Sequence, residues 1–140
     1  MFDWFEDAFQ FASWAGPGLT RPDNKRQLQK LISCSPYQSL AIKNKGHLLA
    51  FGQLQLIGSR AHLARLAVNP LHRRQGLSLL LVNKIIALAA DETILKSVSL
   101  FVFRYNKAAL GAYQQLGFVE TAFPPSIKPI KDCIYMTMHY

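Results

Sequence analysis

A basic turn between an apolar strand and a helix is the first stretch of this sequence suited to chemistry. It spans Val68–Ser78, with the sequence VNPLHRRQGLS. The first backbone N–H groups of a helix lack intrahelical acceptors, and the helix dipole makes that end partly positive. Gly76 lets an anion approach the backbone closely, and Arg73 and Arg74 add charge. This arrangement predicts a phosphate-binding site, although a basic turn with an incidental glycine explains the same residues.

Two common phosphate motifs are absent from the chain. It has no Gly-x-x-x-x-Gly-Lys-Ser/Thr segment, which excludes a P-loop nucleotidase, and no Gly-x-Gly-x-x-Gly segment of a dinucleotide fold. The phosphate carrier must therefore be recognised in another way.

A second segment, Asn106–Phe118 (NKAALGAYQQLGF), predicts a short helix with a ligand-facing side. Asn106 is a favourable N-cap, and Gly117 is a favourable helix stop. Asn106 and Tyr113 are seven residues apart, about two turns, so they share a face. Ala109 between them is small and leaves room for a ligand, while a capped helix with a core tyrosine is the plainer interpretation.

The elements that must position these segments follow from hydrophobic periodicity and turn residues. Aromatic spacing predicts an amphipathic helix over Phe2–Trp14, and Asp23 or Asn24 can cap a second helix over Lys25–Ile32. The later elements alternate in type, and we expect them as strands Ser39–Lys43, His47–Ile57 and Ala61–Val68, helix Gly76–Ala90, strand Ser97–Phe103, helix Asn106–Leu116, and strands Phe118–Ala122 and Cys133–Met138. Antiparallel strands followed by β-α-β-α-β-β predict one mixed α/β domain.

Composition places the chain among ordinary soluble domains. It has 140 residues, half of them apolar, and 17% are charged, so we expect a single domain over residues 1–140. No apolar run approaches the roughly 20 residues of a membrane span, and no secretory signal is evident. Cys34 and Cys133 form no metal-ligand spacing and are expected as core thiols of a cytoplasmic protein. We expect no metal and no membrane partner.

Together, the two segments resemble the Gcn5-related N-acetyltransferase (GNAT) superfamily. Its phosphate motif, Arg/Gln-x-x-Gly-x-Gly/Ala, is similar to Arg73–Ser78, and its second motif, Asn-x-x-Ala-x-x-x-Tyr-x-x-x-Gly-Phe, matches Asn106–Phe118 at every position. Leu66-x-Val68-x-Pro70 also fits, and the resemblance covers Ser39–Tyr140. It implies the GNAT acyltransferase fold and transfer of acetyl from acetyl-CoA to a primary amine, by direct attack in a ternary complex.

The resemblance also implies roles for individual residues. The backbone of Leu66, Ala67 and Val68 would bind the pantetheine arm of acetyl-CoA. Asn106 and Ala109 would border that arm, and Tyr113 would protonate the departing thiolate, which chemistry allows because a tyrosine pKa near 10 lies close to that of a thiol. The pyrophosphate would be held by the turn and helix start, residues Arg73, Arg74, Gln75, Gly76, Leu77 and Ser78.

The sequence departs from the family pattern at four places. Ser78 replaces Gly or Ala, and the strand Ala61–Val68 carries no carboxylate base. Phe101 stands where N-terminal acetylases of the ribosomal-alanine type often carry glutamate, which weakens assignment to that subgroup. The usual first strand is missing, so we expect either a homodimer or an edge strand shielded by the Phe2–Trp14 helix.

The general base and the acceptor stay open at the level of sequence. His62 is a candidate base, with Glu6, Asp7 and water as alternatives. The aromatic N-terminus either borders the acceptor site or covers the sheet, and Ser13–Pro17 resembles a little-characterised bacterial subset of the superfamily.

Three functions are compatible with the sequence to different degrees. A small-molecule or peptide amine is the expected partner, and a catalytically degenerate acyl-CoA sensor is the alternative function. The net charge of +8 favours anionic partners, but the sequence has no concentrated basic stripe, so nucleic-acid binding is not expected.

Overall fold

The protein is built around one six-stranded sheet, seen in a computed structural model that describes residues 1–5, 8–15, 22–33 and 36–139. Along the sheet the strands follow the order β1-β2-β3-β4-β6-β5. Their bounds are β1 Gln38–Asn44, β2 His47–Ile57, β3 Arg60–Val68, β4 Ser97–Phe103, β5 Val119–Thr121 and β6 Cys133–His139. All neighbouring pairs are antiparallel except β3 and β4, which are parallel. The expected mixed sheet is therefore confirmed, and β4 is central as its apolar sequence predicts.

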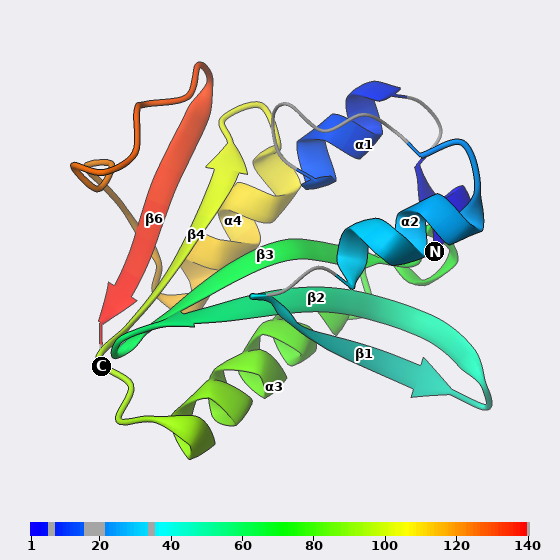
Figure 1. Ribbon diagram of the computed structural model, residues 1–140, viewed down its shortest axis with the longest axis horizontal. Coiled ribbons are helices and arrows are strands. Elements are labelled where there is room, and N and C mark those ends of the chain that lie inside the picture. Colours follow the sequence, from blue (N-terminus) through cyan, green and yellow to red (C-terminus); the bar gives the residue numbers. More distant parts are fainter. Residues whose placement is uncertain (6–7, 16–21, 34–35, 140) are drawn as a thin grey trace.

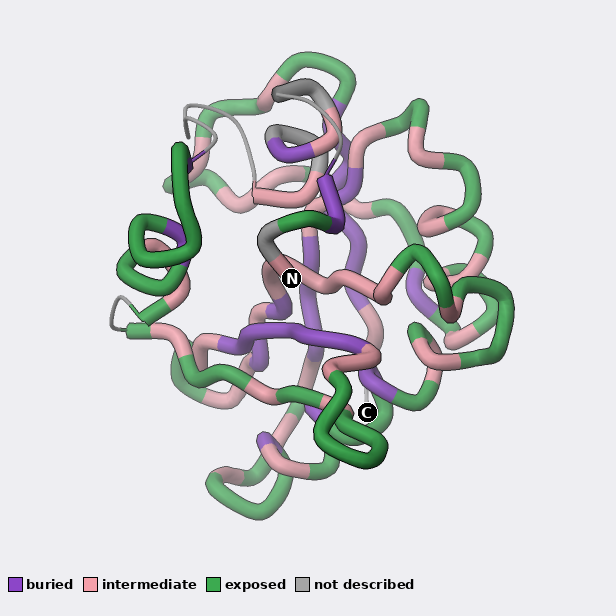
Figure 2. The backbone as a smooth tube through the Cα atoms, turned by 90° about the vertical axis from the view of Figure 1, so that its right-hand side faces the viewer, coloured by how far each residue is buried: buried purple, intermediate pink, exposed green. Residues whose placement is uncertain are grey.

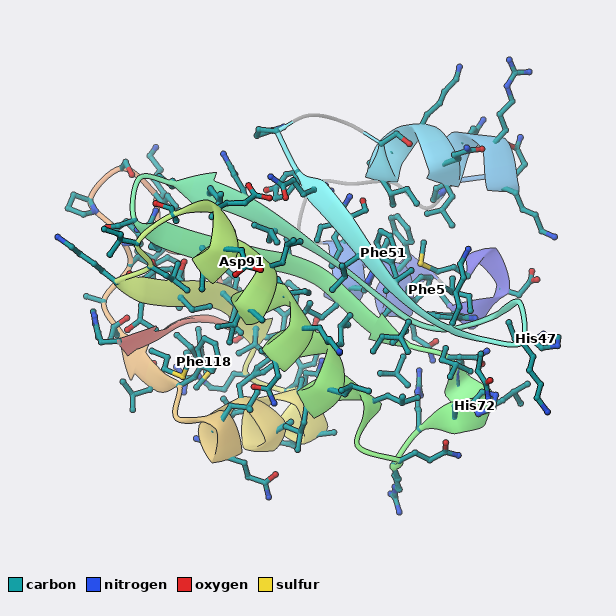
Figure 3. All side chains as sticks on the ribbon, turned by 90° about the horizontal axis from the view of Figure 1, so that it is seen from below. Phe5, His47, Phe51, His72, Asp91 and Phe118 are labelled. Atoms are coloured by element: carbon teal, nitrogen blue, oxygen red, sulfur yellow. The ribbon has the colours of Figure 1, made fainter. Side chains whose placement is uncertain are left out.

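Helices cover both faces of the sheet (Figures 1 and 3). The helices α3 (Leu77–Glu92) and α4 (Lys107–Leu116) lie on one face, and the short helices α1 (Ala8–Ala15) and α2 (Lys25–Ile32) lie on the other. The main core fills the space under α3 and α4, where Leu54, Leu81, Ile85, Leu100 and Phe118 are almost fully buried. Figure 2 shows this burial as continuous stretches along the central strands.

The N-terminal segment differs from its prediction. A single helix over Phe2–Trp14 was expected, but a 3-10 turn η1 spans Phe2–Trp4, Phe5 is extended, and α1 starts at Ala8. The break lets aromatic rings meet face to edge: the Phe5 and Phe11 centroids lie 5.9 Å apart at 88°. The second helix is confirmed, with the Asn24 side chain accepting from the Gln27 N–H as its N-cap.

The N-terminal aromatic residues cover the face of the sheet. Trp4, Phe5, Phe11 and Leu28 form a second buried cluster with Phe51 of β2, and Ala67 of β3 packs against it. Figure 3 shows Phe5 beside Phe51. None of the described members of this cluster comes from β1, and shielding of the β1 edge by the N-terminal segment stays a prediction. A homodimer stays a prediction.

Two smaller expectations concern membranes and thiols. Of the helices that the structure describes, none is long and apolar enough to cross a bilayer. Cys133 is a buried free thiol, as predicted, whereas Cys34 lies outside the described residues.

Candidate active site

The central feature of the site is the place where the two parallel strands, β3 and β4, diverge, which we call the parting. β3 and β4 pair only from Arg60 with Ser97 to Leu63 with Leu100. Beyond these residues β3 continues to Val68 and β4 to Phe103, and the two diverge (Figure 1). The far half of β3 therefore keeps β2 on one side and has an unpaired edge on the side toward β4. A ligand can hydrogen-bond to such an edge as an added strand would.

A β-bulge lies in β3 just past the point of divergence. Phe51 of β2 pairs with Ala67, and Gln53 pairs with Ala64, so Arg65 and Leu66 together face the single residue Gly52. Arg65 adopts a positive φ of 52°, a conformation that costs a non-glycine residue about 1–2 kcal/mol. Bulges and strained residues concentrate beside active sites, where they redirect side chains and backbone groups.

Gly52 makes the bulge possible on the opposite strand. A Cβ atom at Gly52 would lie 2.7 Å from Leu66 Cδ2 and 2.8 Å from Ile85 Cδ1. The absence of a side chain therefore lets Leu66 and the helix α3 close over this part of β2. No local pattern in the sequence distinguishes this glycine.

The basic turn leads into α3 as predicted. Asn69 accepts a hydrogen bond from the Leu71 N–H, and a short 3-10 turn η2 (Pro70–His72) follows; Figure 3 labels His72 in this turn. Arg74 and Gly76 have positive φ values of 62° and 76°, and α3 begins at Leu77 with Gly76 as its N-cap. Successive amides in such a turn form an anion-binding concavity.

Whether a phosphate fits at this turn depends on the space around the backbone of Gly76. A Cβ atom built on Gly76 would meet no heavy atom within 4 Å, so the backbone faces open space. Arg73, Arg74 and Gln75 are exposed and can move toward an anion. Ser78, the departure from the family pattern, is also exposed and does not block the helix start. The turn therefore suits the pyrophosphate of a coenzyme A molecule.

The helix α4 has the caps that its sequence predicts. Asn106 Oδ1 accepts from the Ala109 N–H at 3.3 Å, and Gly117 ends the helix with φ of 103°. Tyr113 packs against the main core, with its ring centroid 6.0 Å from that of Phe118. Burial raises the pKa of Tyr113 to about 12, so this side chain keeps its proton at neutral pH. Tyr113 does not line the pocket described next.

A pocket of about 180 Å³ opens where β3 and β4 part, on the face covered by α1. Its walls come from β3, β4, the C-terminal end of α1 and the segments flanking β1 and β6. The lining residues are Trp14, Ala15, Tyr37, His62, Leu63, Ala64, Arg65, Phe101, Val102, Phe103, Ile130 and Cys133. Leu63 and Val102 belong to strand positions that face the main core, so the pocket reaches into the parting itself. The helices α3 and α4 lie on the opposite face of the sheet from this pocket.

His62 lies in this pocket but is poorly suited to accept a proton. Its Nδ1 lies 2.9 Å from Ser99 Oγ, and its ring meets Phe101 at 5.2 Å between centroids. Burial, with a smaller contribution from Arg60, lowers the pKa of His62 to about 4. The imidazole is therefore neutral at pH 7 and a weaker base than an unperturbed histidine. Glu6 and Asp7, the other candidates, lie outside the described residues.

Sequence reasoning missed several residues of the pocket. Tyr37, Arg65 and Cys133 reach it from segments that are far apart in sequence, and only the tertiary structure brings them together. Phe101 was noted as a departure from a subgroup pattern, and the structure places it between His62 and the Phe123 and Tyr135 rings. Its neighbours Phe103 and Val102 carried no signal beyond that of a buried strand.

Comparisons with known proteins agree with this arrangement. A family model described as Acetyltransferase (GNAT) family matches residues 1–118. The [Ribosomal protein bS18]-alanine N-acetyltransferase of Escherichia coli K12 is 31% identical over 99 residues, which cover 69% of this chain and 64% of that protein. The matched region thus spans less than two thirds of the length of this curated relative.

Solved structures of N-acetyltransferases share the fold. The E. coli ribosomal-protein-S18-alanine N-acetyltransferase has a TM-score of 0.67 at 23% identity, covering 94% of this chain and 85% of that one. The PaiA N-acetyltransferase of Thermoplasma acidophilum, solved in complex with coenzyme A, has a TM-score of 0.67 at 18% identity, covering 82% and 70%.

Proposed function

Because the chain belongs to the Acetyltransferase (GNAT) family, we propose that it transfers the acetyl group of acetyl-CoA to a primary amine, by direct attack in a ternary complex. The parting of β3 from β4 is the observation that carries this proposal. It lies between the turn at the start of α3, which would bind the pyrophosphate, and the pocket on the opposite face of the sheet. A thioester lying in the parting would be open to attack from the pocket.

The residues that would hold acetyl-CoA lie along one path. The amides of Arg74–Ser78 would bind the pyrophosphate, with Arg73 and Arg74 as counter-charges. The free edge of β3 at Leu66, Ala67 and Val68 would pair with the amide groups of the pantetheine arm. Asn106 and Ala109 at the start of α4 would border the same arm.

Tyr113 would supply the proton that the departing thiolate needs. When the neutral amine attacks, a C–N bond forms, the nitrogen loses one proton to water, the C–S bond breaks and the electron pair leaves with sulfur. The Tyr113 hydroxyl is protonated at neutral pH and would donate to that sulfur and take its proton back from water afterwards, but its pKa of about 12 makes it a weaker acid than the free tyrosine whose pKa lies close to that of a thiol. The proposed role requires only that the hydroxyl reach the sulfur when acetyl-CoA is bound.

The weak basicity of His62 bears on which amine is accepted. At pH 7 only about one lysine amine in two thousand is neutral, whereas about one α-amine in ten is. Because the described residues of the pocket supply no strong base, the pocket favours α-amines over lysine amines. The curated relative is named for an alanine N-acetyltransferase, which supports an α-amine, although Phe101 replaces the glutamate common in that subgroup. The free, buried Cys133 is compatible with the cytoplasm, where we place the protein.

Release of coenzyme A thiol tests the proposal directly. The purified protein would be mixed with acetyl-CoA and separate amines: amino acids, peptides with a free N-terminus, polyamines and aminoglycosides. We expect amine-dependent thiol release with at least one α-amine, and mass spectrometry should show the product heavier by one acetyl group. Thiol release that does not depend on any amine would contradict transfer.

A second candidate function is an acyl-CoA sensor without catalysis. The observation that favours it is the absence of a carboxylate among the described residues of the pocket, together with the lowered pKa of His62. A sensor would bind acetyl-CoA tightly and release no thiol with any amine. Calorimetric binding combined with the thiol assay separates the two functions.

A further inference from the structure

Arg65 is the only cationic residue among the described residues that line the pocket, and the chain holds it in an unusual way. Its backbone occupies the left-handed region at the β3 bulge, where glycine or asparagine would be less strained. Arg65 also lines the pocket. A strained, non-glycine residue that lines a cavity is a reason to look for a ligand.

The guanidinium of Arg65 is held in place by neutral groups. Its Nη1 donates to Gln53 Oε1 at 2.7 Å, and its Cζ lies 5.1 Å from the centroid of the Tyr37 ring. Gln53 is fully buried, and its Nε2 donates to Ser39 Oγ at 2.9 Å and to the Ile32 carbonyl. The amide of Gln53 is thus fixed with its oxygen toward Arg65, and this hydrogen bond holds the guanidinium of Arg65 in position before any ligand binds.

The charge of Arg65 has no partner within the described part of the chain. The ion pair found there joins Arg104 to Glu120, away from the pocket, and the buried Nε of Arg65 has no hydrogen-bond acceptor. A planar guanidinium with free donors suits a carboxylate, which accepts two parallel hydrogen bonds. Arg65 is half-buried and only its Nε is fully buried, so an anionic ligand in the pocket would supply the counter-charge that the described residues do not.

The other pocket walls are apolar or aromatic. Trp14, Phe101, Phe103 and Ile130 supply rings and aliphatic surface beside the guanidinium. The volume of about 180 Å³ is below the roughly 300–1,000 Å³ of sites for drug-sized ligands, so the acceptor is small. Polyamines would find no described acidic residue here to balance their charge.

We infer that the acceptor is a small α-amino acid with an apolar or aromatic side chain, and that Arg65 binds its carboxylate. This inference rests on the proposed function and names its substrate class. The side chain would lie against the rings, and the amine would point into the parting of β3 and β4. A peptide N-terminus would lack the carboxylate that Arg65 is placed to bind.

Matched acceptors test the inference on the unmodified protein. Thiol release with L-phenylalanine would be compared with L-phenylalaninamide and 2-phenylethylamine, with rates corrected for the neutral fraction of each amine. We expect kcat/KM for L-phenylalanine to exceed both by about 10- to 100-fold, the range for a hydrogen bond to a charged group. Equal or faster acetylation of the two amines that lack the carboxylate would overturn the inference and leave the proposed function standing.

Two variants then locate the effect at Arg65. Arg65→Gly removes the guanidinium and adopts φ of 52° without strain, and Arg65→Lys keeps the charge but loses the fork. Both should lower the ratio of kcat/KM for L-phenylalanine over its amide, with Arg65→Gly bringing it below about threefold, mainly through KM. Circular dichroism would confirm folding. A ratio unchanged in folded Arg65→Gly would overturn the role of Arg65.

Binding measurements separate failure of the inference from failure of the proposed function. N-acetyl-L-phenylalanine and its amide would be titrated calorimetrically into the protein saturated with coenzyme A. Carboxylate-dependent binding that is lost in Arg65→Gly, without turnover of any amine, would support the site and remove the acetyltransferase. Neither binding nor turnover with either probe would overturn both.

Discussion

Placing a negative charge at the start of α3 should weaken the binding of acetyl-CoA. Gly76→Asp puts a carboxylate where the pyrophosphate would lie, and Gly76→Asn places an uncharged side chain of the same shape there. A Cβ at Gly76 meets no atom within 4 Å, so the Cβ atom of either side chain has open space. Asparagine and aspartate both tolerate the positive φ of 76° better than other residues.

The size of the effect follows from the exposure of the turn. Two unit charges 4 Å apart repel by about 1 kcal/mol in bulk water and by about 4 kcal/mol at an effective dielectric constant of 20. Gly76 is exposed, so a value near the lower end applies to each phosphate charge. Gly76→Asp should therefore weaken binding by about tenfold or more beyond Gly76→Asn.

Isothermal titration calorimetry with acetyl-CoA at low and moderate salt would measure this difference. The gap between the two variants should shrink as salt is added, because exposed charges are screened. Equal affinities for the folded Asp and Asn variants at low salt would refute the placement of the pyrophosphate at this turn.

Three further predictions concern catalysis, pH and packing. Tyr113→Phe should lower turnover with a working amine by about 10²–10⁴-fold while acetyl-CoA affinity stays nearly constant, and a fall below threefold would remove the acid role. Burial lowers the pKa of His62 to about 4, below its value of about 6.5 in the unfolded chain, so the folded state is favoured fully above pH 6.5 and progressively less as the pH falls toward 4. The free energy of unfolding of wild type, measured with urea, should therefore fall by about 1–2 kcal/mol more between pH 7 and 5 than that of His62→Gln. Parallel pH profiles of the two proteins would contradict the burial of His62. Gly52→Ala should destabilise the fold by about 1–3 kcal/mol through its contacts with Leu66 and α3, whereas Gly111→Ala, on an open helix surface, should stabilise it by about 0.5–1 kcal/mol; similar denaturation midpoints for the two would refute the close approach at Gly52.

Much of the fold could be predicted because its elements have strong local signals. The strands His47–Ile57 and Ser97–Phe103 agree with the structure to the residue, since turn residues and alternating or continuous apolar runs mark their ends. Gly76 and Gly117 mark helix boundaries through positive φ values that glycine adopts without strain. The N-terminal helix was predicted too long because aromatic spacing alone does not reveal the extended Phe5 that separates η1 from α1.

The site was predictable only on the side that we propose to bind acetyl-CoA. That side lies in two contiguous segments, at Gly76 and Asn106, where caps and spacing are visible in the sequence. The acceptor pocket depends on long-range pairing: the bulge at Arg65 follows from a register shift against Gly52, which no local pattern encodes. The side chains of Arg65, Gln53 and Tyr37 meet only because β1, β2 and β3 pair as they do.

Hydrogen–deuterium exchange with and without acetyl-CoA tests most directly whether the parting of β3 and β4 is the cofactor site. Bound acetyl-CoA should slow exchange in two separate segments, the free edge of β3 at residues 66–68 and the start of α3 at residues 74–78. Exchange in β1, residues 38–44, should not change. Calorimetrically confirmed binding with slowed exchange in neither segment, or only elsewhere, would contradict the account.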